Sequence, residues 1–205
     1  MDLYNLLISD SILGLFLQVL PISLISGLFY FTYQVTKVKL ANHTPMWKDL
    51  ALRTIFVCYL AGLLNLVLTP NNLWTYIWFY LFNGFEGCTI GPLLTFDYNL
   101  VPSLIQCIMG DLTIGSWVKT MLLGNFFMFI PMGLLLPMAL PITTIKKNLL
   151  HAIAIPLVIE TIQPFVGRSF DIDDLVSNFC GIIIGFCIFR AGRRLMNSLT
   201  HTTTI

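Results

Sequence analysis

Charged residues are scarce in this chain of 205 residues, which has 11 Lys and Arg, 10 Asp and Glu, and a formal net charge of +1. They make up 10% of the chain, whereas soluble domains carry about 25%. This scarcity, with 57% hydrophobic residues, excludes a soluble globular enzyme and a disordered chain. The lack of a basic surface excludes a nucleic-acid-binding protein, because phosphate backbones are bound by clustered Lys and Arg.

Catalytic and metal-binding motifs are also lacking. The chain has no serine-nucleophile motif, P-loop or zinc motif, and its three histidines are scattered. Five cysteines are present, of which Cys58, Cys180 and Cys187 fall in apolar runs and are expected to behave as small apolar side chains. Cys88 and Cys107 leave two interpretations open, a disulfide bond outside the membrane and two buried thiols.

Five apolar runs approach or exceed the length of about 20 residues that crosses a bilayer. They cover residues 11–33, 50–68, 118–140, 149–166 and 175–190. The sequence therefore predicts an all-α, polytopic membrane helix bundle of about five transmembrane helices in the cell membrane. Pro131 and Gly133 are expected to kink the third helix. The first ten residues lack a basic region, so the first run is expected to remain as a span.

The basic residues predict the orientation. Nine of the 11 Lys and Arg fall on one predicted side: Lys37, Lys39, Lys48, Arg53, Lys146, Lys147, Arg190, Arg193 and Arg194. The positive-inside rule places this side in the cytoplasm, with the N-terminus outside and the C-terminus inside. The predicted regions are a two-span region at 1–70, an aromatic-rich segment at 71–117, a three-span core at 118–190 and a cytoplasmic tail at 191–205. Residues 72–82 read equally as a helix in the outer interface or as a piece packed on the bundle.

Polar residues inside the spans mark a candidate site, because ionisable groups in a membrane are costly and face protein or water. Glu160 and Gln163 share one face of the fourth span, and Asn125 and Asn178 lie in the outer half of the third and fifth. In the fifth span, Asp174 and Asn178 share a stripe with a Gly-x-x-x-Gly pair. That pair, Gly181 and Gly185, allows another helix to approach closely.

The connection between the fourth and fifth spans adds charge directly above these residues. Arg168 is outnumbered by Glu160, Asp171, Asp173 and Asp174. Such a site repels an anion unless a divalent cation such as Mg²⁺ or Ca²⁺ bridges it; otherwise it suits a cation, an amine or a hydroxyl-rich ligand. A structural interpretation stays open, in which Arg168 pairs with an acid, Asp171 caps the fifth helix and the asparagines bond between helices.

Three blocks within residues 99–190 resemble the VanZ-like family of bacterial membrane proteins. They are Asn99-Leu100-Val101-Pro102; the Gly-Asn-x-x-x-Phe-x-Pro-x-Gly run at 124–133; and Glu160-x-x-Gln163 followed by Arg168, Asp171, Asp174, Asn178 and Gly181. The family takes its name from a protein in a glycopeptide-resistance cluster associated with reduced susceptibility to teicoplanin. The resemblance implies a role in antibiotic resistance or cell-envelope homeostasis.

The residues and the resemblance together predict a protein that acts at the outer leaflet. Its expected partners are membrane lipid and a lipid-linked envelope precursor or a glycopeptide, not nucleic acid. The alternative is a membrane-embedded, metal-dependent enzyme acting on an envelope lipid or polyprenyl-linked substrate. A small transporter and an assembly factor are further alternatives. The candidate ligand-binding residues are Asn125, Glu160, Gln163, Arg168, Asp171, Asp173, Asp174 and Asn178, and the helix-packing residues are Pro131, Gly133, Gly181 and Gly185.

Overall fold

The computed structural model describes residues 3–7, 11–70, 73–83, 94–109, 116–140 and 144–202. The chain divides into two compact units. Unit 1 comprises Met1–Tyr98 and Thr161–Phe170, and unit 2 comprises Asn99–Glu160 and Asp171–Ile205. Two of the boundaries between the units fall inside two short paired strands, β1 (Tyr98–Asn99) and β2 (Phe170–Asp171).

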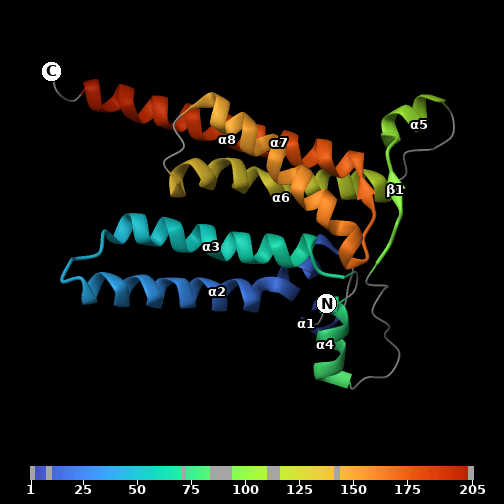
Figure 1. Cartoon of the computed structure of the whole chain (residues 1–205), viewed down its shortest axis with the longest axis horizontal. Coiled ribbons are helices and arrows are strands. Elements are labelled where there is room, and N and C mark those ends of the chain that lie inside the picture. Colours follow the sequence, from blue (N-terminus) through green and yellow to red (C-terminus); the bar gives the residue numbers. More distant parts are fainter. Residues whose placement is uncertain are drawn as a thin grey trace. The chain divides into compact units, whose positions relative to one another are not determined.

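Unit 1 is built on a hairpin of two long helices, α2 (Ile12–Leu40) and α3 (Trp47–Val67), which run antiparallel (Figure 1). The side chain of Ser11 caps α2 by accepting a hydrogen bond of 3.1 Å from the backbone N–H of Gly14. Gly62 packs closely on α2, because a Cβ there would lie 2.6 Å from Ser23 Oγ. Small residues thus allow the two apolar helices to approach closely.

Two shorter helices, α1 (Leu3–Leu7) and α4 (Leu73–Asn83), lie at the beginning of α2, and α4 runs across the direction of the hairpin (Figure 1). Gln18, only 2% exposed, joins these elements. Its Nε2 donates to Leu7 O at 2.6 Å and to Thr75 Oγ1 at 3.1 Å, and its backbone O accepts from Trp78 Nε1 at 3.1 Å. The predicted aromatic helix therefore exists and is bonded to the first span.

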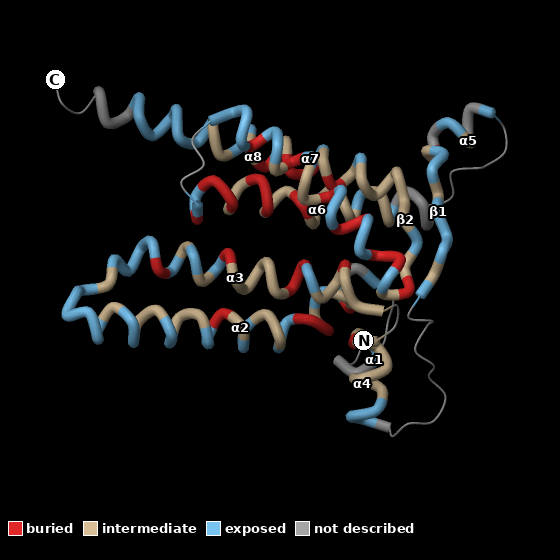
Figure 2. The backbone as a smooth tube through the Cα atoms, in the orientation of Figure 1, coloured by how far each residue is buried: buried red, intermediate tan, exposed pale blue. Residues whose placement is uncertain are grey.

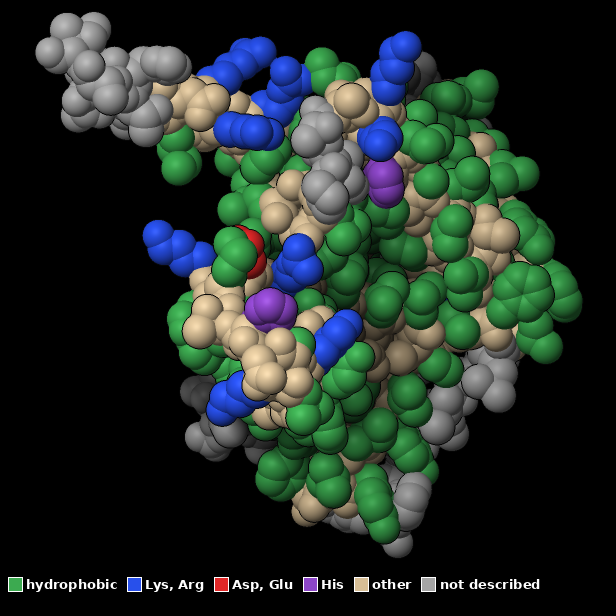
Figure 3. Space-filling view, turned by 60° about the vertical axis from the view of Figure 1, so that its left-hand side comes forward, with side chains coloured by type: hydrophobic (Ala, Val, Ile, Leu, Met, Phe, Trp, Pro, Cys, Tyr) green, Lys and Arg blue, Asp and Glu red, His purple; other side chains and the backbone are tan. Residues whose placement is uncertain are grey.

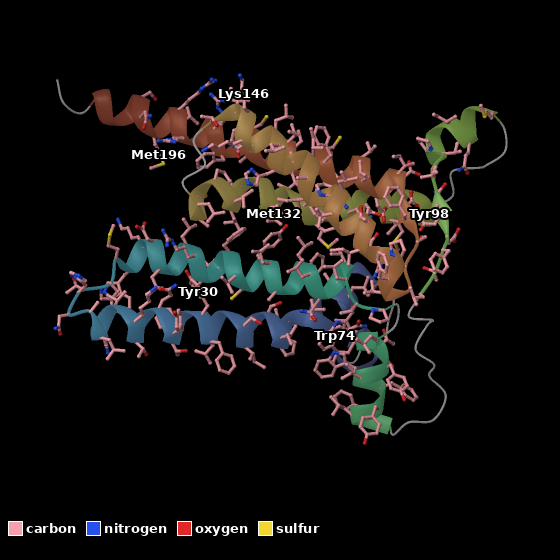
Figure 4. All side chains as sticks on the ribbon, viewed as in Figure 1. Tyr30, Trp74, Tyr98, Met132, Lys146 and Met196 are labelled. Carbon is pink, nitrogen blue, oxygen red and sulfur yellow. The ribbon has the colours of Figure 1, made fainter. Side chains whose placement is uncertain are left out.

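Unit 2 contains α5 (Ser103–Met109), α6 (Ser116–Ala139), α7 (Ile145–Ile162) and α8 (Ile172–Thr202). Its buried residues gather along α6, α7 and α8 (Figure 2), and Phe129 and Met132 of α6 are 0% and 3% exposed. Figure 4 labels Met132 midway along α6, with Lys146 at the start of α7 and Met196 near the end of α8. Helices α6 and α8 run in the same direction and pack directly on each other, and α7 runs in the opposite direction (Figure 1).

Glycines set the register of the α6–α8 pair. A Cβ added to Gly181 would overlap the backbone O of Phe126, and one added to Gly185 would overlap that of Ile130. From the other side, a Cβ on Gly133 would overlap the backbone O of Ile182. The two backbones therefore touch at three glycines, an arrangement that only residues without a side chain permit.

Within the part of the chain that the structure describes, five helices are long and apolar enough to cross a membrane: Leu13–Leu40, Trp47–Val67, Thr120–Ala139, Ile145–Val166 and Ile172–Ser198. Many large apolar side chains point outward, among them Leu28 and Phe29, which are 64% and 72% exposed. A lipid solvent accounts for such exposure. The predicted all-α, multi-pass membrane fold is confirmed.

The prolines do not end the helices that contain them. Pro21 lies inside α2, Pro131 and Pro137 inside α6, and Pro156 inside α7. The third span is one continuous helix, α6, through both Pro131 and Pro137. Within a membrane, neighbouring helices and nearby hydroxyl groups satisfy the backbone carbonyls that a proline leaves unpaired.

Candidate functional site

An acidic cluster lies at the beginning of α8 in unit 2. Asp171 caps this helix, because its Oδ1 accepts a hydrogen bond of 2.8 Å from the backbone N–H of Asp173. Its other oxygen, Oδ2, accepts from Asn99 Nδ2 at 3.2 Å. Asp171 therefore performs the capping role that the sequence left open, and it also binds the strand that precedes α5.

Glu160 lies near the end of α7 and is completely buried, with 0% of its surface exposed. Its Oε2 accepts a hydrogen bond of 3.2 Å from the backbone N–H of Asp171. The buried residues of α7 recur along one face, at Asn148, Ala152, Pro156, Ile159 and Glu160. The carboxylate of Glu160 therefore lies on the buried face of an apolar helix and contacts the acidic start of α8.

The carboxylate of Asp173 anchors a second element to this cluster. Its Oδ2 accepts a hydrogen bond of 2.8 Å from the backbone N–H of Ser103, the first residue of α5. Gln106 Nε2 donates to Asn99 Oδ1 at 3.3 Å and to Val101 O at 2.8 Å. Three polar residues that the sequence did not assign to the site, Asn99, Ser103 and Gln106, thus contact it directly or through one another.

Asp174, Asn178 and Asn125 lie in the same unit, along the α6–α8 pair. Asp174 is half-buried in the first turn of α8, and Asn178 one turn later is 2% exposed. Among the residues that the structure describes, none hydrogen-bonds to Asn178 Oδ1. The predicted bond between helices is therefore not made by this oxygen. Asn125, on α6, is half-buried.

Charge is strongly separated along unit 2. Its described acidic residues all lie at the end of α7 or the start of α8: Glu160, Asp171, Asp173 and Asp174. The described basic side chains lie at the other ends of the same helices: Lys146, Lys147, Arg190, Arg193 and Arg194. Figure 3 brings this basic end forward, with Lys and Arg side chains exposed on it.

Gln163 and Arg168 belong to unit 1, in the segment that follows α7. Gln163 begins a short 3₁₀ helix, η1 (Gln163–Val166), and its Nε2 donates to Val67 O at 3.3 Å. Arg168 Nη1 donates to Leu66 O at 3.1 Å. Both side chains thus bind carbonyl oxygens at the end of α3, which have no partner within their own helix. The structure places the other six candidate residues in unit 2.

The described residues contain no group of three or more His, Cys, Asp or Glu side chains arranged to hold a metal ion. Cys58, Cys180 and Cys187 are free thiols. Cys88 and Cys107, for which the sequence left open a disulfide bond or two buried thiols, lie outside the residues whose side chains are described.

The fold and the site define a polytopic α-helical membrane protein in which a buried carboxylate meets an acidic helix start. The sequence profile of the VanZ/LLP1 family matches residues 56–196. The chain therefore belongs to the VanZ/LLP1 family, as its motifs predicted, and the match begins within α3, earlier than those motifs. Comparison with curated proteins and with solved structures gives no match.

Proposed function

We propose that this VanZ/LLP1-family protein acts at the outer leaflet of the cell membrane, in glycopeptide resistance of the teicoplanin type or in cell-envelope homeostasis. Its ligand-binding end is the acidic end of unit 2, formed by Glu160 and the first turn of α8. Family membership supports the proposal. The charge separation supports the orientation, because the end rich in Lys and Arg is expected in the cytoplasm.

The observation that carries the proposal is the complete burial of Glu160 in a helix long and apolar enough to span a membrane. A carboxylate in such a place is costly, and proteins keep one there chiefly for function. Its bond to the backbone of Asp171 joins it to three further acids at the start of α8. This concentration of acceptors suits a ligand that carries hydrogen-bond donors or positive charge.

Expression of the chain in a teicoplanin-sensitive Gram-positive host tests this proposal. The wild-type chain is expected to raise the inhibitory concentration of teicoplanin, and Glu160→Gln and Asp174→Asn are expected to remove most of that protection. Each change keeps the shape of the side chain and removes its negative charge.

Asp49→Asn is the matched control, since Asp49 is an exposed acid in the first turn of α3. It is expected to protect as well as wild type at the same membrane level. Full protection by Glu160→Gln and Asp174→Asn would contradict the proposal, and so would a wild-type chain that gives no protection.

A further inference from the structure

Asn178 presents a buried hydrogen-bond acceptor that the described protein does not use. The residue lies inside the fifth span, is 98% buried, and its Oδ1 receives no hydrogen bond from any described residue. An unsatisfied acceptor at such a position destabilises a fold, and native proteins rarely keep one. Its presence points to a donor outside the residues that the structure describes, and a bound ligand can supply one.

The register of α6 on α8 brings a second polar residue to the same level. Gly181 of α8 packs on the backbone of Phe126 and lies close to Phe129 Cβ. One turn before Gly181 is Asn178, and one turn before Phe129 is Asn125. The two asparagines therefore occupy the same layer of the α6–α8 interface. Because Asn125 is only half-buried, this layer is accessible from one side.

Asp174 completes the group on the side of the acidic cluster. It precedes Asn178 by four residues, so the two side chains share one face of α8. Helical side chains lean toward the N-terminus of their helix, which directs the Asn178 amide toward the turn of Asp174. The other described charged side chains at the start of α8 are also acids, Asp171 and Asp173.

We propose that Asn178, Asn125 and Asp174 bind a primary ammonium group. Such a group has three N–H donors, which match two amide oxygens and one carboxylate, and its charge complements the acidic surroundings. A phosphate would meet only acceptors and acids there. A quaternary ammonium has the charge but no N–H to satisfy Asn178 Oδ1. This ammonium site specifies the ligand chemistry of the acidic end of unit 2, and it rests on the proposed function, in which that end binds the ligand.

The experiment compares lipids that differ only in the nitrogen of the head group. The full chain is placed in nanodiscs of phosphatidylcholine and phosphatidylglycerol, and phosphatidylethanolamine with the same acyl chains replaces the choline lipid stepwise. The thermal unfolding midpoint is expected to rise and saturate. In a second arm, dissolved ethanolamine is added to nanodiscs without the ethanolamine lipid, which distinguishes a lipid head group from a free amine.

Asn178→Leu is the informative variant, because it removes the unsatisfied acceptor at similar volume and is expected to fold at least as well as wild type. It should need about tenfold more of the amine for half of the rise, the loss typical of one hydrogen bond to a charged group. Asp174→Asn, a second variant, should weaken the response similarly. Asn65→Leu is the control: it changes a half-buried asparagine of α3, whose Nδ2 bonds to Ala61 O, and should respond like wild type.

Saturation by the ethanolamine lipid in wild type but not in Asn178→Leu supports a lipid head group as the source, and the same pattern with dissolved ethanolamine supports a free amine. Equal responses of wild type and both site variants, or no response at all, would overturn the ammonium site. Teicoplanin protection that depends on Glu160 could still be present in that case, so this failure is distinguishable from failure of the proposed function.

Discussion

Replacing Gly185 by alanine is expected to destabilise the folded protein by about 3 kcal/mol, through steric overlap that the α6–α8 pair cannot relieve. The added methyl group would overlap the backbone O of Ile130 and lie 2.9 Å from the backbone N of Leu134. Both atoms belong to the backbone of a continuous helix, so no side-chain rotation can make room. Thermal unfolding of the detergent-purified chain measures the effect.

The matched control is Gly192→Ala in the same helix. A Cβ at Gly192 has no atom within 4 Å. Because alanine favours helix over glycine by about 1 kcal/mol, this change should leave the unfolding midpoint unchanged or raise it. Equal midpoints for Gly185→Ala and wild type would show that α6 and α8 do not touch at this glycine.

The second large effect is expected at Asp171, whose replacement by alanine should cost about 2 kcal/mol. The change removes the cap on Asp173 N–H at the start of α8 and leaves Asn99 Nδ2 without its acceptor. Hydrogen exchange at the first turn of α8 should increase, together with a lower unfolding midpoint.

Asp49→Ala is the comparison for Asp171→Ala. Asp49 is also an acid in the first turn of a long helix, but it is exposed, and among the described residues its carboxylate accepts no hydrogen bond from another element. Its loss should lower stability by less than about 0.5 kcal/mol. If the two substitutions cost the same, Asp171 does not join β1 to the start of α8.

Hydropathy predicts where a chain can sit in lipid, and it located the five spans well. It could not give the length of α8, which continues from Ile172 to Thr202 although the predicted span ends at residue 190. The last turns contain Arg193 and Arg194, which are too polar for lipid and still form helix. Helix length depends on backbone hydrogen bonds and propensity, whereas hydropathy reports only the membrane-embedded part.

The candidate site was only partly predictable. Helical spacing placed Asp174, Asn178 and the glycines on one stripe, since residues three or four apart share a face. It could not show that Gln163 and Arg168 bind backbone carbonyls at the end of α3, because these carbonyls lie 96 and 102 residues earlier in the chain. Backbone carbonyls leave no signal in a sequence.

The contact of Ser103 with Asp173 was missed for the same reason, because the donor is a backbone N–H. Asn99 is different. It stands in the first block that resembles the family, directly before Leu100-Val101-Pro102, and that block was the available signal for a polar partner of the acidic cluster. The pairing of β1 with β2, which the sequence does not indicate, brings Asn99 to its partner, Asp171.

We propose that the acidic end of unit 2 faces the outside of the cell. Two single-cysteine variants, in a chain whose five native cysteines are replaced by alanine, test it with a membrane-impermeant maleimide. Ile105→Cys lies on α5, which Asp173 anchors at the acidic end, and Ser198→Cys lies at the basic end of α8; both positions are exposed. In intact cells we expect labelling at residue 105, and at residue 198 only after permeabilisation. The reverse pattern would contradict the account.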